Sequence, residues 1–404
     1  MTDDEHVDTR TEKALLVLGI VVLGFNLRPA VVSVGPVLDE ITDGLSMTST
    51  TAGLLTTLPV IAFALFGATA SGLARWIGIH KLTLLSLGAV MGGLALRALV
   101  DSPAAFLALS LVALAGMATA NVLLPSLVKL HFPRRVGLLT SLYTTAMAVG
   151  LTSASVFTVP LSEQLGSWRW GLFAWAATAL VAALPWLALT RHDRKPEIES
   201  RSISLSDVAR TPLGWAMAVF FGLQALQAFT VFGWFAQVYR DAGFSATTAG
   251  LLLGVTTAIS IPLSFVVPSV AARLRNQSWL ISAFVGCYAV GFVGLTVAPV
   301  DGAWLWATAA GLGASVFPLA LTLIGLRART EEGTAALSGF TQSVGYLLAA
   351  GGPLGVGVLY DMVGDWSVPL TVLSVLFIPL LVAGLIVARP AYIEDYLGKH
   401  PGPA

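Results

Sequence analysis

The chain has 404 residues, of which 56% are hydrophobic and only 11% are charged, with 22 basic and 22 acidic side chains. An ordinary soluble domain carries about 25% charged residues, so the composition excludes a soluble domain and indicates an integral membrane protein. The zero formal net charge gives no indication of a nucleic acid partner.

The chain begins with 13 polar, acidic residues, and the apolar run that follows is too long for the core of a signal peptide. Apolar runs then recur along the whole chain, each bounded by charge, Gly or Pro. About 20 helical residues are enough to cross the hydrocarbon of a membrane. The pattern therefore predicts twelve transmembrane helices, at residues 14–38, 50–70, 82–100, 104–128, 137–161, 168–190, 214–239, 247–270, 278–298, 303–326, 334–360 and 366–388.

The first run holds one ionisable residue, Arg28, within the segment GFNLRPAVVSVGP. Arginine keeps its proton at any useful pH, and placing it at mid-helix costs roughly 2.5–3.5 kcal/mol. Pro29 removes a backbone donor, so carbonyl groups near Phe25 become free to accept from the guanidinium. We predict an anion receptor, because a planar guanidinium can hold a carboxylate, nitro or pseudohalide group with two parallel hydrogen bonds. The alternative is structural: Arg28 reaches the membrane surface or locks the first helix.

Neutral polar side chains inside other spans predict the remainder of a polar cavity. Gln224 and Gln227 are three residues apart and share a helix face, and Trp234 could stack on a planar solute. Each polar side chain could instead bridge two helices, and Trp234 could anchor at the lipid interface. The candidate substrate-binding residues are Arg28, Asn26, Asn121, Tyr143, Gln224, Gln227, Trp234, Gln342 and Tyr346.

The longest polar segment divides the runs six and six. It predicts a cytoplasmic N-terminal tail (1–13), a six-helix bundle (14–190), a cytoplasmic linker (191–213), a second six-helix bundle (214–388) and a cytoplasmic C-terminal tail (389–404). The hexapeptide TTAGLL occurs at residues 50–55 and again at 247–252, an offset of 247 − 50 = 197. A duplication of this kind predicts two pseudo-symmetric bundles with the substrate between them, the architecture of the major facilitator transporters.

The basic residues lie mainly on one side of the predicted membrane. The loops on the side of both termini hold 18 of the 22 Lys and Arg residues, whereas the opposite side holds only Arg97, Arg169 and Arg240. The positive-inside rule therefore predicts a multi-pass protein of the cell membrane, plasma or inner, with both termini in the cytoplasm.

No carboxylate and no histidine falls well inside a predicted span. Membrane metalloenzymes and proteases need clustered His and carboxylate ligands or a paired acid and base, so we expect neither catalysis nor a metal or cofactor. A coupling proton could travel with the substrate, or titrate Asp39, Glu40 or Asp361 at the span ends. The single cysteine, Cys287, lies in an apolar run and is expected to be a packing residue.

Four stretches carry a more specific resemblance: FNLRPAVVSVGPVL, NVLLPSLVKLHFPRRVGLLTSLYTTAM, GLQALQAFTVFGWFAQVYRDAGFSATTAGLLL and SGFTQSVGYLLAAGGPLGVGVLYDMVGDW. With them the chain resembles the cyanate and 2-nitroimidazole transporter (CynX/NimT) family of the major facilitator superfamily. The resemblance implies the all-α twelve-helix fold, alternating access and a small solute, often anionic or nitro-bearing. It also points to Asn26, Arg28, Asn121 and Gln224 as positions that match family motifs.

The sequence thus predicts a secondary transporter, active as a monomer in the lipid bilayer, that binds a small solute near Arg28. One alternative is a multidrug efflux transporter, in which the cavity is broad and apolar and Arg28 is structural. A second is a membrane receptor that binds a solute without transporting it.

Overall fold

The computed structural model describes residues 10–132, 135–190 and 204–397, and all the regular structure within them is helical. Twelve helical segments there are long and apolar enough to cross a membrane. They match the twelve predicted runs, so this prediction is confirmed. Residues 1–9 of the predicted N-terminal tail, 191–203 of the predicted linker and 398–404 of the predicted C-terminal tail lie outside the described residues, and the exact domain limits stay predictions.

The first half of the chain runs from α1 to α8. Its elements are α1 (Arg10–Asn26), α2 (Pro29–Val32), the 3-10 helix η1 (Gly35–Val37), α3 (Leu38–Leu45), α4 (Ser49–Ile77), α5 (Ile79–Arg97), α6 (Pro103–His131), α7 (Val136–Gln164) and α8 (Trp168–Leu189).

The second half runs from α9 to α20. Its elements are α9 (Leu205–Ala209), α10 (Pro212–Asp241), α11 (Ala246–Ala258), α12 (Ser260–Arg273), α13 (Ser278–Val297), α14 (Ala303–Gly313), α15 (Val316–Leu326), α16 (Glu331–Ala349), α17 (Gly351–Val363), α18 (Ser367–Val375), α19 (Phe377–Val387) and α20 (Ile393–Tyr396).

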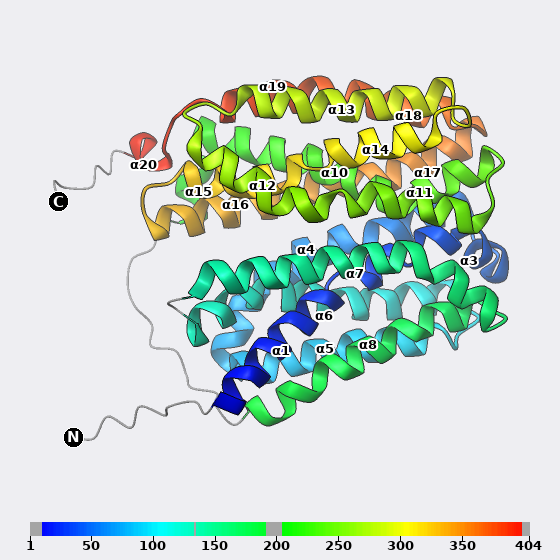
Figure 1. Cartoon of the computed structure of the whole chain (residues 1–404), viewed down its shortest axis with the longest axis horizontal. Coiled ribbons are helices and arrows are strands. Elements are labelled where there is room, and N and C mark those ends of the chain that lie inside the picture. The colour runs from blue at the N-terminus through cyan, green and yellow to red at the C-terminus, as the bar shows by residue number, and fades with distance from the viewer. Residues whose placement is uncertain (1–9, 133–134, 191–203, 398–404) are drawn as a thin grey trace.

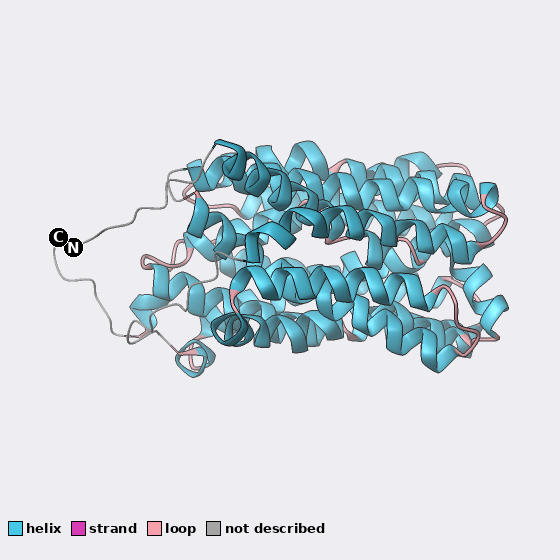
Figure 2. Ribbon diagram, turned by 90° about the horizontal axis from the view of Figure 1, so that it is seen from below, coloured by secondary structure: helices cyan, strands magenta, loops and turns pink. Residues whose placement is uncertain are grey.

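The two halves form two bundles that lie against each other along their length (Figure 1). Most helices run roughly along one common axis (Figure 2). Helices α4 and α7 of the first bundle pack against α17 and α11 of the second. We call the end of the molecule that carries α3, the start of α4 and the ends of α10 and α17 the α3 end; α20 lies at the opposite end (Figure 1).

Proline sets where the helices of the second bundle break. Three of these breaks fall just before Pro262, Pro318 and Pro353, and a fourth falls just before Pro379, whereas α12 continues through Pro268. Proline has no N–H to donate to the carbonyl four residues earlier, and its ring clashes with that carbonyl. In the first bundle α4 and α6 continue through Pro59 and Pro125.

The structure also carries the sequence repeat. Helix α4 begins after Thr48, whose side chain accepts a hydrogen bond from the backbone of Thr51. Helix α11 begins after Ser245, which caps the backbone of Thr248 in the same way. The two caps are 245 − 48 = 197 residues apart, the offset of the repeated hexapeptide. The duplication therefore extends to the way corresponding helices begin.

Candidate functional site

Arg28 lies in a break of the first span. Helix α1 ends at Asn26 and α2 begins at Pro29, so Arg28 occupies the junction. Its Nη1 donates to the carbonyl of Leu27 at 3.1 Å. This carbonyl lies beside Arg28, whereas the sequence pointed to carbonyl groups near Phe25. Arginine has five N–H donors, and Arg28 is only partly buried. The other four donors have no acceptor among the described residues, so they are available to a ligand.

Aromatic side chains from both bundles lie beside Arg28. Its guanidinium carbon is 5.8 Å from the ring centre of Phe63 in α4. The Phe63 ring stacks on Tyr346 of α16, with centres 5.1 Å apart and planes 20° apart. Phe229 of α10 lies 6.3 Å from Phe63 and 6.2 Å from Tyr346. Two of the predicted site residues, Arg28 and Tyr346, therefore lie together at the contact between the bundles. Phe63 lies between them, and the sequence did not single out this residue.

Two predicted amides bond within their own bundles. The Nδ2 of Asn26 donates to the carbonyls of Val22 and Thr178, and its Oδ1 accepts from the Thr178 hydroxyl at 2.7 Å. These contacts tie α1 to α8. The Nε2 of Gln227 donates to the carbonyl of Leu373 in α18 at 2.8 Å. Both amides therefore bridge two helices of one bundle, which is the alternative to lining the cavity that the sequence left open.

The other predicted residues are dispersed. Gln224 is fully buried, and neither its Oε1 nor its Nε2 has a hydrogen-bond partner among the residues that the structure describes. Gln342 donates to Ser338 in its own helix at 2.8 Å. Tyr143 is buried in α7, where its backbone packs closely against Gly24 of α1. Asn121 is partly buried in α6.

Trp234 lies near the α3 end, away from a lipid-facing position. It is 3% exposed, its Nε1 donates to the carbonyl of Pro353 at 3.0 Å, and its ring meets Trp366 edge-on at 5.7 Å. It lines a cavity of about 300 Å³ together with Asp39 and Asp241.

Another arginine at the end of a span, Arg97, is fully buried, which its sequence position did not predict. Arg97 ends α5 and is 0% exposed. It makes no ion pair with any residue that the structure describes. Its position at the end of an apolar run made it look like a boundary charge. The apolar residues Ala98–Val100, which separate Arg97 from Asp101, are the sequence signal that Arg97 lies within the apolar run and not at its boundary.

Polar contacts join the two bundles at the α3 end. Arg240 of α10 pairs with Asp39 at 3.2 Å and with Glu40 at 2.8 Å, both in α3. The Asp361 carboxylate of α17 accepts from the hydroxyl of Thr50 in α4 and, at 2.7 Å, from its backbone N–H.

A further contact of the same kind links α7 and α11. The hydroxyl of Thr247 donates to Glu163 at 3.3 Å. Thr50 and Thr247 are equivalent positions of the repeat. The α3 end is therefore closed by contacts that recur in both halves.

Two six-helix bundles, with a partly exposed cation and aromatic rings where they meet, have the architecture of a major facilitator membrane transporter. Residues 15–353 match the Major Facilitator Superfamily. The chain belongs to this superfamily, within its cyanate and 2-nitroimidazole transporter family.

Two relatives in this family and one solved structure show the extent of the similarity. The chain is 34% identical over 385 residues to the 2-nitroimidazole transporter of Escherichia coli (strain K12), covering 95% of this chain and 97% of that one. It is 28% identical over 358 residues to the cyanate transport protein CynX of the same organism, covering 87% and 92%. A crystal structure of a variant of the nucleoside transporter NupG superposes with a TM-score of 0.76 at 12% identity, covering 93% of this chain and 100% of that one. The last likeness concerns the fold alone.

Proposed function

We propose that this transporter carries a small planar solute with an anionic or nitro group across the cell membrane, by alternating access, and that Arg28 binds that group. The observation that carries the proposal is the position of Arg28: it lies at a helix break between the bundles, and four of its N–H donors have no acceptor in the part of the chain that the structure describes. A charge at mid-membrane is unfavourable without a partner. An anionic or electron-rich group would supply one, with paired hydrogen bonds.

The aromatic side chains support a planar solute. Phe63, Phe229 and Tyr346 offer ring faces and edges beside the guanidinium. Offset stacking on such rings is worth about 0.5–1.5 kcal/mol for each pair. The names of the two relatives fit this chemistry, because cyanate is an anion and 2-nitroimidazole is a flat ring with a nitro group. We assign direct contact to Arg28 and Tyr346, and a positioning role to Asn26, which fixes α1 against α8.

The orientation follows from the distribution of basic residues. The termini lie in the cytoplasm under this proposal, and the α3 end faces the outside. The contacts at the α3 end then close the outer entrance in the state described. Opening requires them to break while the bundles close at the cytoplasmic end.

The experiment is thermal stabilisation of the purified full-length chain by 2-nitroimidazole, cyanate and benzoate. A solute that binds only the folded state at 100 times its dissociation constant adds about 2.7 kcal/mol to the free energy of unfolding. We expect at least one solute to raise Tm in the wild type and in Arg169→Gln, but not in Arg28→Gln. Arg169 is the matched control because it pairs with Asp101 inside one bundle.

Two outcomes contradict the proposal. A folded Arg28→Gln variant that is stabilised as strongly as the wild type excludes Arg28 as the receptor. Solute binding without counterflow in proteoliposomes would support a receptor instead of a transporter.

A further inference from the structure

The buried guanidinium of Arg97 is poorly satisfied by the protein. Its Nη1 is 3.4 Å from the hydroxyl of Ser110, and its Nη2 is 3.5 Å from that of Ser33. Both distances are at the long limit of a hydrogen bond. Its Nε has no hydrogen-bond partner within residues 10–132, 135–190 and 204–397, and its guanidinium carbon lies 5.7 Å from the ring centre of Phe106. A buried charge without a counter-ion is strongly unfavourable, so purely structural packing is a poor explanation for this residue.

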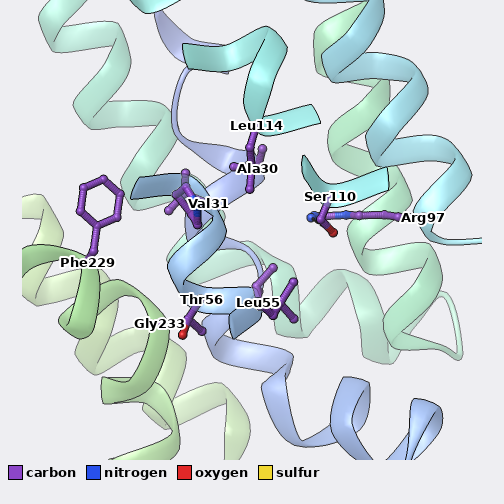
Figure 3. A pocket seen from close by; sticks show the side chains of 11 residues that line it. Ala30, Val31, Leu55, Thr56, Arg97, Ser110, Leu114, Phe229 and Gly233 are labelled. Carbon is purple, nitrogen blue, oxygen red and sulfur yellow. Dashed lines mark hydrogen bonds between the residues drawn. The ribbon is translucent and has the colours of Figure 1, made fainter. Parts of the chain in front are cut away.

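Arg97 also lines a cavity at the contact between the two bundles. Arg97 and Ser110 lie on one side of it, and Phe229 and Gly233 of α10 lie on the other (Figure 3). The cavity measures about 10 Å³, which is room for about one water molecule. Its wall therefore includes residues of both bundles, and its size depends on how the bundles are placed.

The cavity lies next to the helix break that carries Arg28. Ala30, Val31 and Val34 line it, and they follow Arg28 in the chain by two to six residues, toward α3. Ser33, the partner of Arg97, belongs to the same segment. The contacts of the α3 end lie farther along the same direction. The cavity is thus placed between Arg28 and the closed entrance.

We propose that Arg97, with the hydroxyls of Ser33 and Ser110, forms a second site for the same class of small anion, on the α3 side of Arg28. This inference rests on the proposed function, because it makes Arg97 a second binding site on the path of the transported solute. In the closed state the cavity is too small for the solute. Movement of Phe229 and Gly233 with the second bundle enlarges it, and the guanidinium and two hydroxyls then face the entering anion.

The test uses thiol labelling to measure the electrostatic effect of Arg97 in the cavity and the binding of an anion there. Because Cys287 is the only cysteine, the variant Cys287→Ser with Thr56→Cys carries one thiol, in the cavity wall. This full-length chain, in nanodiscs, is labelled with an anionic (sulfonatoethyl) and a cationic (trimethylammonioethyl) methanethiosulfonate. We expect Arg97→Gln to lower the ratio of anionic to cationic labelling rates about tenfold, because it removes a nearby positive charge. Arg97→Lys should keep the ratio.

Protection by thiocyanate, a stable pseudohalide, tests occupancy. We expect it to slow labelling in the parent and in Arg28→Gln, and to have no effect in Arg97→Gln. Protection that survives in Arg97→Gln, an unchanged ratio, or absence of labelling in the parent would each overturn the proposal. A lower Tm of Arg97→Gln with unchanged ratio and protection would assign Arg97 a structural role. Failure of the proposed function is seen separately, as absence of counterflow and of stabilisation that depends on Arg28.

Discussion

Arg240 is expected to hold the α3 end closed. It is the residue of the second bundle that pairs with both Asp39 and Glu40 of the first. The side chains are 18%, 38% and 37% exposed, respectively, so solvent screens these pairs and each is worth at most about 1 kcal/mol. Removing both with Arg240→Gln should therefore shift the balance between closed and open states by about 1–2 kcal/mol. That corresponds to about 5–30-fold more of the open state.

Labelling of the thiol at position 56 measures this shift, because Thr56 is 6% exposed in the closed state. In the chain with Cys287→Ser and Thr56→Cys, the labelling rate should rise by the same 5–30-fold when Arg240→Gln is added. High salt should raise the rate of the parent toward that of the variant, since the Debye length falls to about 3 Å at 1 M.

Arg169→Gln is the control for loss of one positive charge at the same end. Arg169 pairs with Asp101 at 2.7 Å and donates to the carbonyl of Ala98 at 3.2 Å, and all three residues lie in the first bundle. The Arg169→Gln substitution should therefore leave the labelling rate of the thiol at position 56 unchanged. An equal increase in both variants, or none in Arg240→Gln, would refute the view that the Arg240 pairs close this end.

Two further predictions concern packing and pH. A side chain on Gly357 would meet the carbonyl of Ser49 at 2.6 Å, so Gly357→Ala should cost about 1–3 kcal/mol of folding stability and lower Tm. Gly355 has open space around it, so Gly355→Ala is the control and should leave Tm unchanged. Equal losses of stability in the two variants would contradict this reasoning. Burial acts to raise the pKa of Glu394, but hydrogen bonds, from the backbone N–H of Thr330 among others, outweigh it and hold the pKa below its usual range. Its contribution to stability is therefore present above its unfolded pKa of about 4.3 and is lost as pH falls through the folded value. Protection against hydrogen exchange at residues 393–397, measured relative to the intrinsic exchange rate at each pH, should fall in acid in the wild type and be low at all pH values in Glu394→Gln. Protection that does not change with pH in the wild type would exclude this role.

The twelve spans follow from local rules, which is why the sequence predicts them well. The break at Arg28 has a local cause too, although the sequence was interpreted there only as a helix with freed carbonyl groups. Length and hydropathy determine what crosses a membrane, and Pro29 lacks the N–H that would continue α1. The same rule accounts for the break before Pro353. The repeated hexapeptide marks the duplication because it begins corresponding helices.

The direction in which a polar side chain points could not be predicted in the same way. A helix at the contact between the bundles has one face toward its own bundle and another toward the opposite one, and a buried amide suits both. Asn26 and Gln227 bond within their own bundles, whereas Tyr346 lies at the contact between them. Arg97 was missed for a related reason: hydropathy cannot distinguish an arginine that reaches the membrane edge from one that turns inward.

Under the proposed function, the contacts at the α3 end connect the duplication with alternating access. Thr50 and Thr247 are equivalent residues in the first turns of α4 and α11, and each meets a carboxylate near the last turn of a helix from the other bundle. The N-terminus of a helix carries a partial positive charge, so a carboxylate is stabilised there without a buried ion pair. Such a contact is strong enough to close the entrance, yet its groups are readily hydrated when it separates. A duplicated chain forms it twice about its pseudo-symmetry axis, so one rocking motion of the bundles breaks both contacts together.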